Sequence, residues 1–140
     1  MKAFIDTGGF AAIYYKRDPF HGQIVSSWET ALSERWQLYT SNYVVSETVT
    51  LLRGRSNHAE AVRFGESLGS SAVIRIVRLS EMHEHGAWEI FKKYADQDFS
   101  FTDCTSFALM RDLHIPMAFA FDRHFRVMGF EILPFVGSHD

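Results

Sequence analysis

A chain of 140 residues with 46% hydrophobic and 15% aromatic residues is long enough for one packed domain, which excludes an intrinsically disordered protein. The formal charge of −3 excludes a global positive field, so an anionic ligand has to be held by local arginines or by bound cations. The single cysteine, Cys104, excludes an intrachain disulfide, and no apolar run approaches the roughly 18 residues of a membrane-spanning helix. We expect one domain over residues 1–140, in the cytoplasm and away from membranes.

Apolar runs and helical periodicities alternate along the chain. They predict strands over residues 2–6, 36–40, 72–79, 117–121 and 129–135. They predict helices over residues 7–15, 18–32, 44–54, 57–68, 80–94 and 102–113. Alternation of this kind is typical of an α/β protein with a mostly parallel sheet between two layers of helices.

Several helix starts carry local capping signals. Asp18 followed by Pro19 is typical of an N-cap and a first helical position. Asn57 with Glu60 three residues later predicts a capping box, and Ser80 predicts the cap of the next helix. Helices are therefore expected to begin at these three points.

Four carboxylates fall at the ends of the predicted elements where ligands bind in an α/β fold. Asp6 and Asp122 each follow an apolar strand, whereas Glu47 and Asp103 lie in the first turns of helices. Taken singly, each is more typical of a turn, a cap or a solvated helix face. If the strands are neighbours, however, the four converge and must take up protons or bind a cation.

A cluster of carboxylate oxygens suits Mg²⁺ or Mn²⁺, and such an ion can hold a phosphodiester and activate a water molecule. Nearby hydroxyls that could orient metal-bound water belong to Thr7, Ser100 and Thr102. Asp96 and Asp98 compete with Asp103 as ligands, and we favour Asp103 because it stands at a helix start.

Four blocks of the sequence resemble, in order, the motifs of PIN-domain ribonucleases. The blocks are "FIDTGGF", "SNYVVSETVTLL", "DFSFTDCTSFALM" and "FAFDRHFRVMGFEILP", and together they span nearly the whole chain. The likeness is greatest to the VapC-type toxins of toxin–antitoxin pairs. It implies a Rossmann-like three-layer sandwich with a central, mostly parallel sheet of four to five strands.

The resemblance also implies an activity and a site. It implies a Mg²⁺- or Mn²⁺-dependent endoribonuclease that cleaves RNA phosphodiester bonds by metal-activated water. Carried over by position, Asp6, Glu47, Asp103 and Asp122 are the catalytic and metal-binding acids. Thr7 matches the hydroxyl residue that commonly follows the first acid, with Thr102 as a second supporting hydroxyl. One departure is Ala120, where many relatives have Thr or Ser two residues before the fourth acid.

Partners follow from the same resemblance: an RNA substrate, a cognate antitoxin and a second copy of the chain in a homodimer. Basic side chains near the acids are candidates for phosphate contacts, namely Arg53, Arg55, Arg123 and Arg126, with His124 as a candidate general acid. Aromatic candidates for an antitoxin groove, each equally compatible with the core, are Phe10, Tyr14, Tyr15 and Trp28. His83, His85 and Cys104 are interpreted as a solvated helix face and a packed thiol.

Other functions were weighed against this one. The Asp-Thr-Gly at residues 6–8 is also typical of aspartic proteases, but those are β proteins and need a second such triplet, which the chain lacks. A phosphate-accepting receiver domain needs a late lysine, and none follows Lys93. The remaining alternatives share the PIN fold: a nuclease acting on DNA or structured RNA outside a toxin–antitoxin pair, or a degenerate domain that binds without cutting.

Overall fold

The computed structural model describes residues 1–134 and has one five-stranded sheet in their midst. Its strands lie in the order β3-β2-β1-β4-β5, and every adjacent pair is parallel. Their bounds are β1 (Lys2–Ile5), β2 (Gln37–Ser41), β3 (Ile74–Val77), β4 (Met117–Phe119) and β5 (Glu131–Leu133). The predicted α/β fold is confirmed, and the part of the last predicted strand at residue 135 lies outside the described residues.

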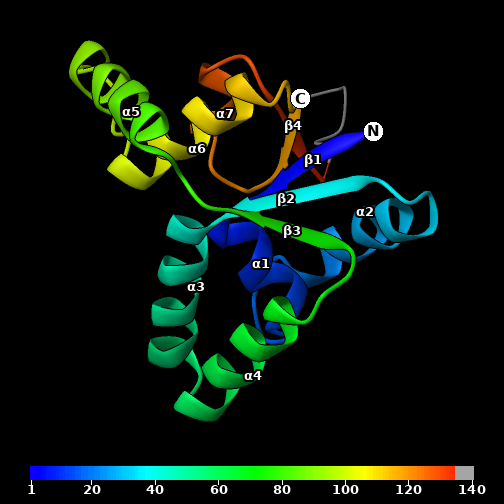
Figure 1. The fold of residues 1–140 in the computed structure, drawn as a ribbon. Coiled ribbons are helices and arrows are strands. Elements are labelled where there is room, and N and C mark those ends of the chain that lie inside the picture. The colour runs from blue at the N-terminus through cyan, green and yellow to red at the C-terminus, as the bar shows by residue number, and fades with distance from the viewer. Residues whose placement is uncertain (135–140) are drawn as a thin grey trace.

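Helices cover both faces of the sheet, as Figure 1 shows. On one face lie α1 (Thr7–Tyr14), α2 (His21–Ser33), α3 (Asn42–Arg55) and α4 (His58–Gly69). On the other lie α5 (Glu81–Lys93), α6 (Phe101–Asp112) and α7 (His124–Val127). The chain thus leaves β1 through helices on one face and enters β4 from helices on the other. The switch in strand order therefore falls between β1 and β4, where ligands of such folds bind.

Side-chain caps fix most of the helix starts. Ser41, Asn57, Ser80 and Ser100 each accept a hydrogen bond from the backbone N–H three residues later. The predicted box at Asn57 is only half formed, because the Glu60 carboxylate pairs with Arg63 instead. Each of these bonds satisfies one of the donors that a helix start leaves free.

The predicted start of the second helix is wrong. This helix begins at His21, and Asp18 lies in the turn before it. The Asp18 side chain accepts a hydrogen bond from the N–H of Phe20 at 2.9 Å, which closes a short turn instead of capping a helix. The dipeptide Asp-Pro is common in both settings, so the local pattern alone does not distinguish them. The short helix α7 was not predicted, because four residues are too few to show a periodicity.

Gly9 allows α1 to lie directly against β4. A Cβ atom built on Gly9 would stand 2.2 Å from the carbonyl oxygen of Phe119, far inside van der Waals contact. The contact lies in the core, because Phe119 itself and Phe10, the residue after Gly9, are fully buried. The glycine therefore fixes how closely the first helix approaches the strand at the switch point.

Candidate active site

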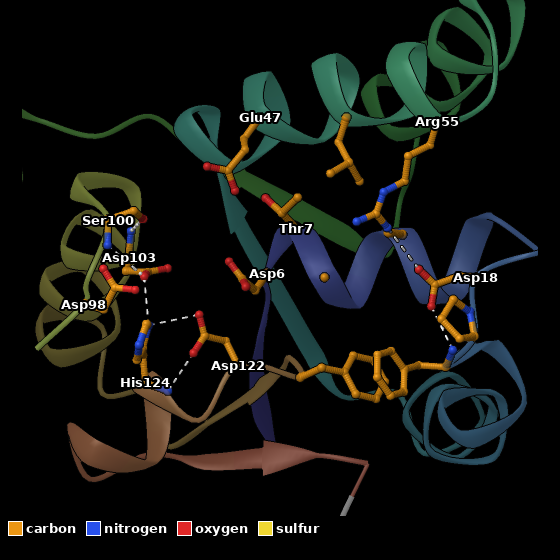
Figure 2. Close-up of a pocket in the computed structure, with 16 residues that line it drawn as sticks. Asp6, Thr7, Asp18, Glu47, Arg55, Asp98, Ser100, Asp103, Asp122 and His124 are labelled. Atoms are coloured by element: carbon orange, nitrogen blue, oxygen red, sulfur yellow. Dashed lines mark hydrogen bonds and ion pairs between the residues drawn. The ribbon is translucent and has the colours of Figure 1, made fainter.

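Asp6 stands directly after β1, on the edge of the sheet where the strand order switches. Its backbone N–H donates to the carbonyl of Phe119 in β4 at 3.1 Å, and the hydroxyl of Thr40 in β2 donates to the carbonyl of Ile5 at 2.8 Å. Asp6 is the N-cap residue of α1, but its carboxylate makes no capping bond. The side chain is only 7% exposed and points toward the other labelled acids in Figure 2. The backbone is thus held on both sides while the carboxylate stays free for a ligand.

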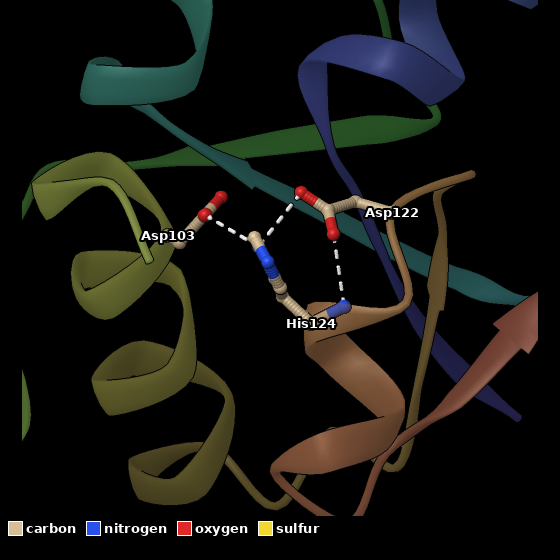
Figure 3. A group of neighbouring side chains, drawn as sticks. All are labelled: Asp103, Asp122 and His124. Carbon is tan, nitrogen blue, oxygen red and sulfur yellow. Dashed lines mark hydrogen bonds and ion pairs between the residues drawn. The ribbon is translucent and has the colours of Figure 1, made fainter. Parts of the chain in front are cut away.

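Asp122 and His124 follow β4 on the neighbouring side of the switch point. The Asp122 Oδ1 atom accepts the backbone N–H of His124 at 2.9 Å, and the Oδ2 atom lies 3.0 Å from the His124 Nδ1. The same Nδ1 lies 3.2 Å from Oδ2 of Asp103, as Figure 3 shows. The imidazole therefore bridges the two carboxylates, one from the strand end and one from α6.

Asp103 reaches the site from the first turn of α6. Its N–H donates to the hydroxyl of Ser100 at 2.9 Å, and its Oδ2 accepts the N–H of Ser100 at 3.0 Å. These two bonds form a complete capping box, so Asp103 has both the structural role and the place in the site that the sequence suggested. Because Oδ2 is taken by the cap and by His124, the Oδ1 atom is the one left for a further ligand.

Glu47 extends from the second turn of α3 across the pocket from Asp103, as Figure 2 shows. It is exposed, unlike Asp6. Thr7 follows Asp6 in the chain and lies near Asp6 and Glu47 in Figure 2. Its Oγ1 atom accepts a weak hydrogen bond from the hydroxyl of Thr48 at 3.5 Å. Glu47 is therefore the most solvated of the four acids.

One pocket of about 580 Å³ collects these groups. The four predicted acids all line it, together with Thr7, Ser100 and His124. Asp98, which the sequence named as a competitor of Asp103, lines it too and is exposed, whereas Asp96 is not among the lining residues. The pocket thus holds an unusual concentration of negative charge at the carboxyl ends of β1 and β4 (Figure 2).

Burial, together with this concentration of charge, raises the pKa of two carboxyl groups of the site. Burial, followed by the charge of Asp103, raises the pKa of Asp6 to about 8, and Glu47 and Asp122 add to the effect. Burial likewise raises the pKa of Asp103, against the opposing effects of its bond to Ser100 and its contact with His124. Without a counter-ion, Asp6 is therefore held largely protonated near neutral pH.

A divalent cation fits these residues. In the part of the chain that the structure describes, no lysine or arginine forms a salt bridge with any of the four acids. The donors are mainly carboxylate oxygens, and single ligand atoms of Asp103, Asp122 and His124 lie within 4.8 Å of one another. Hard oxygen donors with excess negative charge favour Mg²⁺ or Mn²⁺ over softer metals.

Several predicted contacts lie elsewhere. Thr102 does not line the pocket, and its carbonyl accepts a hydrogen bond from Thr105 at 2.6 Å. Of the four arginines, only Arg55 lines the pocket. The other three are exposed outside it, namely Arg53, Arg123 and Arg126.

Two of the four aromatic candidates for an antitoxin groove pack in or against the core, and two line a pocket. Phe10 is fully buried, so its placement on a partner surface is wrong, and Trp28 packs against Phe119 of β4. Tyr14 and Tyr15 line a second pocket of about 370 Å³ between α1 and α4. These two tyrosines therefore remain candidates for a partner contact.

His83, His85 and Cys104 lie outside the pocket. His83 was expected on a solvated face, but its Nε2 lies 2.7 Å from Asp112, whereas His85 is exposed. Cys104 is fully buried, as expected, and burial raises the pKa of its thiol to about 11. A thiol with so high a pKa is a poor nucleophile.

Sequence reasoning missed Asp18 and Phe20, which line the same pocket. Asp18 lies at the end away from His124 (Figure 2), and Phe20 donates its backbone N–H to Asp18. Asp18 was assigned to a helix cap, and a partly exposed phenylalanine in a loop carries no pattern of its own. The phenylalanine directly after Asp-Pro was the one available signal in the sequence.

Fold and site together define an α/β protein with a carboxylate-lined pocket at the switch point of a parallel sheet. The chain belongs to the PIN domain family, whose sequence model matches residues 3–131. It is 37% identical over 132 residues to the 23S rRNA-specific endonuclease VapC20 of Mycobacterium tuberculosis. The aligned region covers 94% of this chain and 98% of that protein. The chain is therefore a VapC-type member of the family.

Three further comparisons agree in the fold or the family. The solved structure of VapC20 superposes with a TM-score of 0.81 at 34% identity, over 91% of this chain and 95% of that one. A VapC ribonuclease of Archaeoglobus fulgidus is 31% identical over 119 residues, 84% of this chain and 75% of that protein. VapBC2 of Rickettsia felis, at 9% identity, a TM-score of 0.68 and coverages of 94% and 97%, shares the fold.

Proposed function

We propose that this protein is a metal-dependent endoribonuclease that cleaves RNA phosphodiester bonds by activated water. The observation that carries the proposal is the convergence of Asp6, Glu47, Asp103 and Asp122 on one pocket, with a carboxyl pKa raised to about 8 at its base. Negative protein and negative substrate are reconciled if a cation lies between them.

The proposed ion is Mg²⁺ or Mn²⁺, held by Asp6 and Asp103 with Glu47 and Asp122 completing the donor set. Bound there, it would supply Lewis acidity toward the phosphodiester and lower the pKa of a water molecule. Thr7 is proposed as a supporting hydroxyl. Thr102 is the weaker proposal, because it does not line the pocket.

The chain's own residues have separate tasks in this proposal. Asp6 is held by its backbone bond to Phe119, so its carboxylate needs little reorganisation to accept a ligand. Glu47, solvated and across the pocket, is placed to accept the proton of the attacking water. His124 orients the carboxylates of Asp103 and Asp122 through its Nδ1.

The relatives support RNA as the substrate class. VapC20 is named a 23S rRNA-specific endonuclease, and its solved structure is described as a sarcin–ricin loop cleaving toxin. The archaeal relative is named a ribonuclease. We therefore take ribosomal RNA as the first substrate to test, and place the activity in the cytoplasm with that RNA. No helix within residues 1–134 is long and apolar enough to cross a membrane.

We further propose that the whole chain acts as one PIN domain and as the toxin of a toxin–antitoxin pair. The description of VapC20 as a toxin supports this role. The antitoxin is expected to cover an apolar surface of the toxin, for which the pocket at Tyr14 and Tyr15 is the best candidate.

A homodimer is also part of the proposal. Trp88 and Phe91 of α5 are 50% and 41% exposed, stack on each other and pack against Phe101 of α6. A cluster of half-exposed aromatic side chains is typical of an interface. The helix has acidic residues in its first turn and lysines in its last, so two antiparallel copies would pair opposite charges across a twofold axis.

The test is cleavage of purified ribosomal RNA with Mg²⁺, with Mn²⁺ and with EDTA, comparing wild type with Asp6→Asn and Asp103→Asn. Asp96→Asn is the matched control, because it removes an exposed carboxylate outside the pocket. We expect defined fragments from wild type and control alone, and none in EDTA. Cleavage that persists in both site variants or in EDTA would refute the mechanism. Single-stranded DNA and flap DNA as parallel substrates distinguish a ribonuclease from a DNA-directed enzyme of the same fold.

A further inference from the structure

The pocket has a second end, opposite His124, that the four acids do not occupy. Figure 2 shows Asp18 and Arg55 there, separated from Asp103 and Asp122 by the width of the pocket. Phe20 and Phe121 line the pocket as well. Among the described residues that line it, Arg55 is the one arginine or lysine. This end therefore differs in chemistry from the acidic end, because aromatic side chains and an arginine accompany its one aspartate.

Asp18 contacts both Phe20 and Arg55. Its Oδ1 accepts the backbone N–H of Phe20 at 2.9 Å, and its Oδ2 lies 3.5 Å from Nη1 of Arg55. The Asp18 side chain is only 5% exposed, so its carboxylate is shielded from bulk water. One buried carboxylate thus fixes the loop that bears Phe20 and orients the guanidinium that extends from the end of α3.

Phe20 has an uncovered surface in spite of its packing. Its ring stacks on Phe121 with centroids 4.3 Å apart and planes 17° from parallel, yet the residue is 40% exposed. Phe121 directly precedes Asp122 in the chain, so the stacked pair is attached to the strand end that bears an acid of the site. A supported aromatic ring that borders a polar pocket is a stacking surface for a planar ligand.

Arg55 keeps most of its hydrogen-bonding capacity. Its side chain is 54% exposed, and the contact with Asp18 uses one nitrogen of a group that carries five N–H donors. The remaining donors are available to an anion in the pocket. Phosphate oxygens are the anions that such a fork binds best.

We propose that Phe20 and Arg55 form a nucleotide subsite beside the metal centre, in which one unpaired base stacks on Phe20 while Arg55 binds a phosphate next to the scissile one. Asp18 is the positioning residue of this subsite. The inference rests on the proposed ribonuclease function and extends it to substrate selection. Stacking needs an unstacked base, so the subsite selects single-stranded loops over duplex RNA.

The test is a double-mutant cycle between protein and RNA. The probe is a short RNA that spans a site cleaved by the wild-type protein in ribosomal RNA, made with a single abasic nucleotide at each position around the cut. We expect one position at which loss of the base lowers kcat/KM about 5- to 100-fold for wild type. For Phe20→Ala the same abasic RNA should be cut as well as the parent RNA, whereas Phe20→Trp should restore the penalty. Leu32→Ala, which removes a 40% exposed apolar side chain of α2 outside the pocket, is the control and should behave as wild type.

Asp18 is tested in the same assay. Asp18→Asn keeps an oxygen for the N–H of Phe20 but removes the charge beside Arg55, so we expect KM to rise several-fold with kcat little changed, and Arg55→Gln to match it. Equal abasic penalties in wild type and Phe20→Ala at every position, with cleavage intact, would overturn the subsite and leave the nuclease function standing. Absence of any cleavage by wild type would instead refute the nuclease function, and the subsite with it.

Discussion

The Nδ1 atom of His124 lies 3.2 Å from the Asp103 carboxylate, although 21 residues separate them in the chain. The contact joins the end of β4 to the start of α6 across the switch point, and Asp122 shares it at 3.0 Å. The imidazole therefore links two carboxylates of the site from within the chain. A cation that binds Asp103 and Asp122 shares these two carboxylates with the imidazole.

The first prediction follows from this contact. His124→Ala leaves Asp103 and Asp122 without their shared partner, and we expect the metal-free protein to lose about 1.5 to 3 kcal/mol in its free energy of unfolding. Because a divalent ion contacts the same two carboxylates that the imidazole contacts, the stabilisation by Mg²⁺ should be larger in the variant than in wild type. Urea denaturation with 10-fold steps of Mg²⁺ measures both. An equal Mg²⁺ effect in the two proteins would show that the imidazole and the ion act independently. His85→Ala, which replaces an exposed histidine of α5 outside the pocket, serves as the control.

The second prediction concerns the pH dependence of the metal-free protein. Asp6 has a folded-state pKa of about 8 against 3.8 for the unfolded chain, so folding favours its protonated form. Its contribution to stability is full below about pH 4 and is lost as the pH rises toward 8. Asp6→Asn cannot ionise and should therefore exceed wild type at pH 8 by on the order of 2 to 5 kcal/mol.

The measurement is urea denaturation in EDTA at pH 5 and pH 8. The difference between Asp6→Asn and wild type is expected to grow with pH, which separates Asp6 from other groups that titrate in both proteins. Saturating Mg²⁺ at pH 8 should reverse the order, because the ion stabilises the carboxylate and not the amide. A constant difference across the pH range would contradict the raised pKa.

The third prediction tests the packing at the switch point. Gly9→Ala places a methyl group 2.2 Å from the Phe119 carbonyl oxygen, and we expect a loss of about 1 to 3 kcal/mol or more in the free energy of unfolding. Gly54→Ala in α3 has no atom within 4 Å of the new methyl and should gain roughly 0.5 to 1 kcal/mol. Thermal unfolding of the pair measures the contrast. If both glycines tolerate alanine equally, α1 does not contact β4 as closely as the structure has it.

The parts of the site that depend on buried strands were predictable from sequence. A run of apolar residues that ends in one carboxylate, as at Asp6 and Asp122, predicts both the strand and the side of the sheet on which its ligand binds. Asp103 was predictable for a second reason, since Ser-x-x-Asp before an apolar helix fixes the helix start. The sequence did not show that these acids lie together, because that depends on which strands are neighbours. The parallel pairing of β1 with β4 brings them to one edge of the sheet.

The parts that depend on loops were not predictable. The sequence around Asp18 fits a helix cap as well as the turn that Asp18 forms with Phe20. The contact with Arg55, which is distant in the chain, distinguishes the turn from the cap. The edge strand β3 is shorter than its alternating pattern, because it pairs with β2 alone and its flanks have no second partner. Phe10 was ambiguous for a related reason, since an aromatic side chain in a short helix fits a core and a surface equally well. Tertiary contacts decide all three, and no local pattern contains them.

The last prediction concerns self-association through α5. Trp88→Lys places a charge in the exposed aromatic cluster, where a second copy would have to bury it unpaired. We expect light scattering to show a dimer for wild type and a monomer for Trp88→Lys at the same concentration. Val62→Lys on α4 introduces the same charge at a 41% exposed apolar position on the opposite face of the sheet and should remain dimeric. A dimeric Trp88→Lys would place the interface elsewhere, and a monomeric wild type would refute the homodimer.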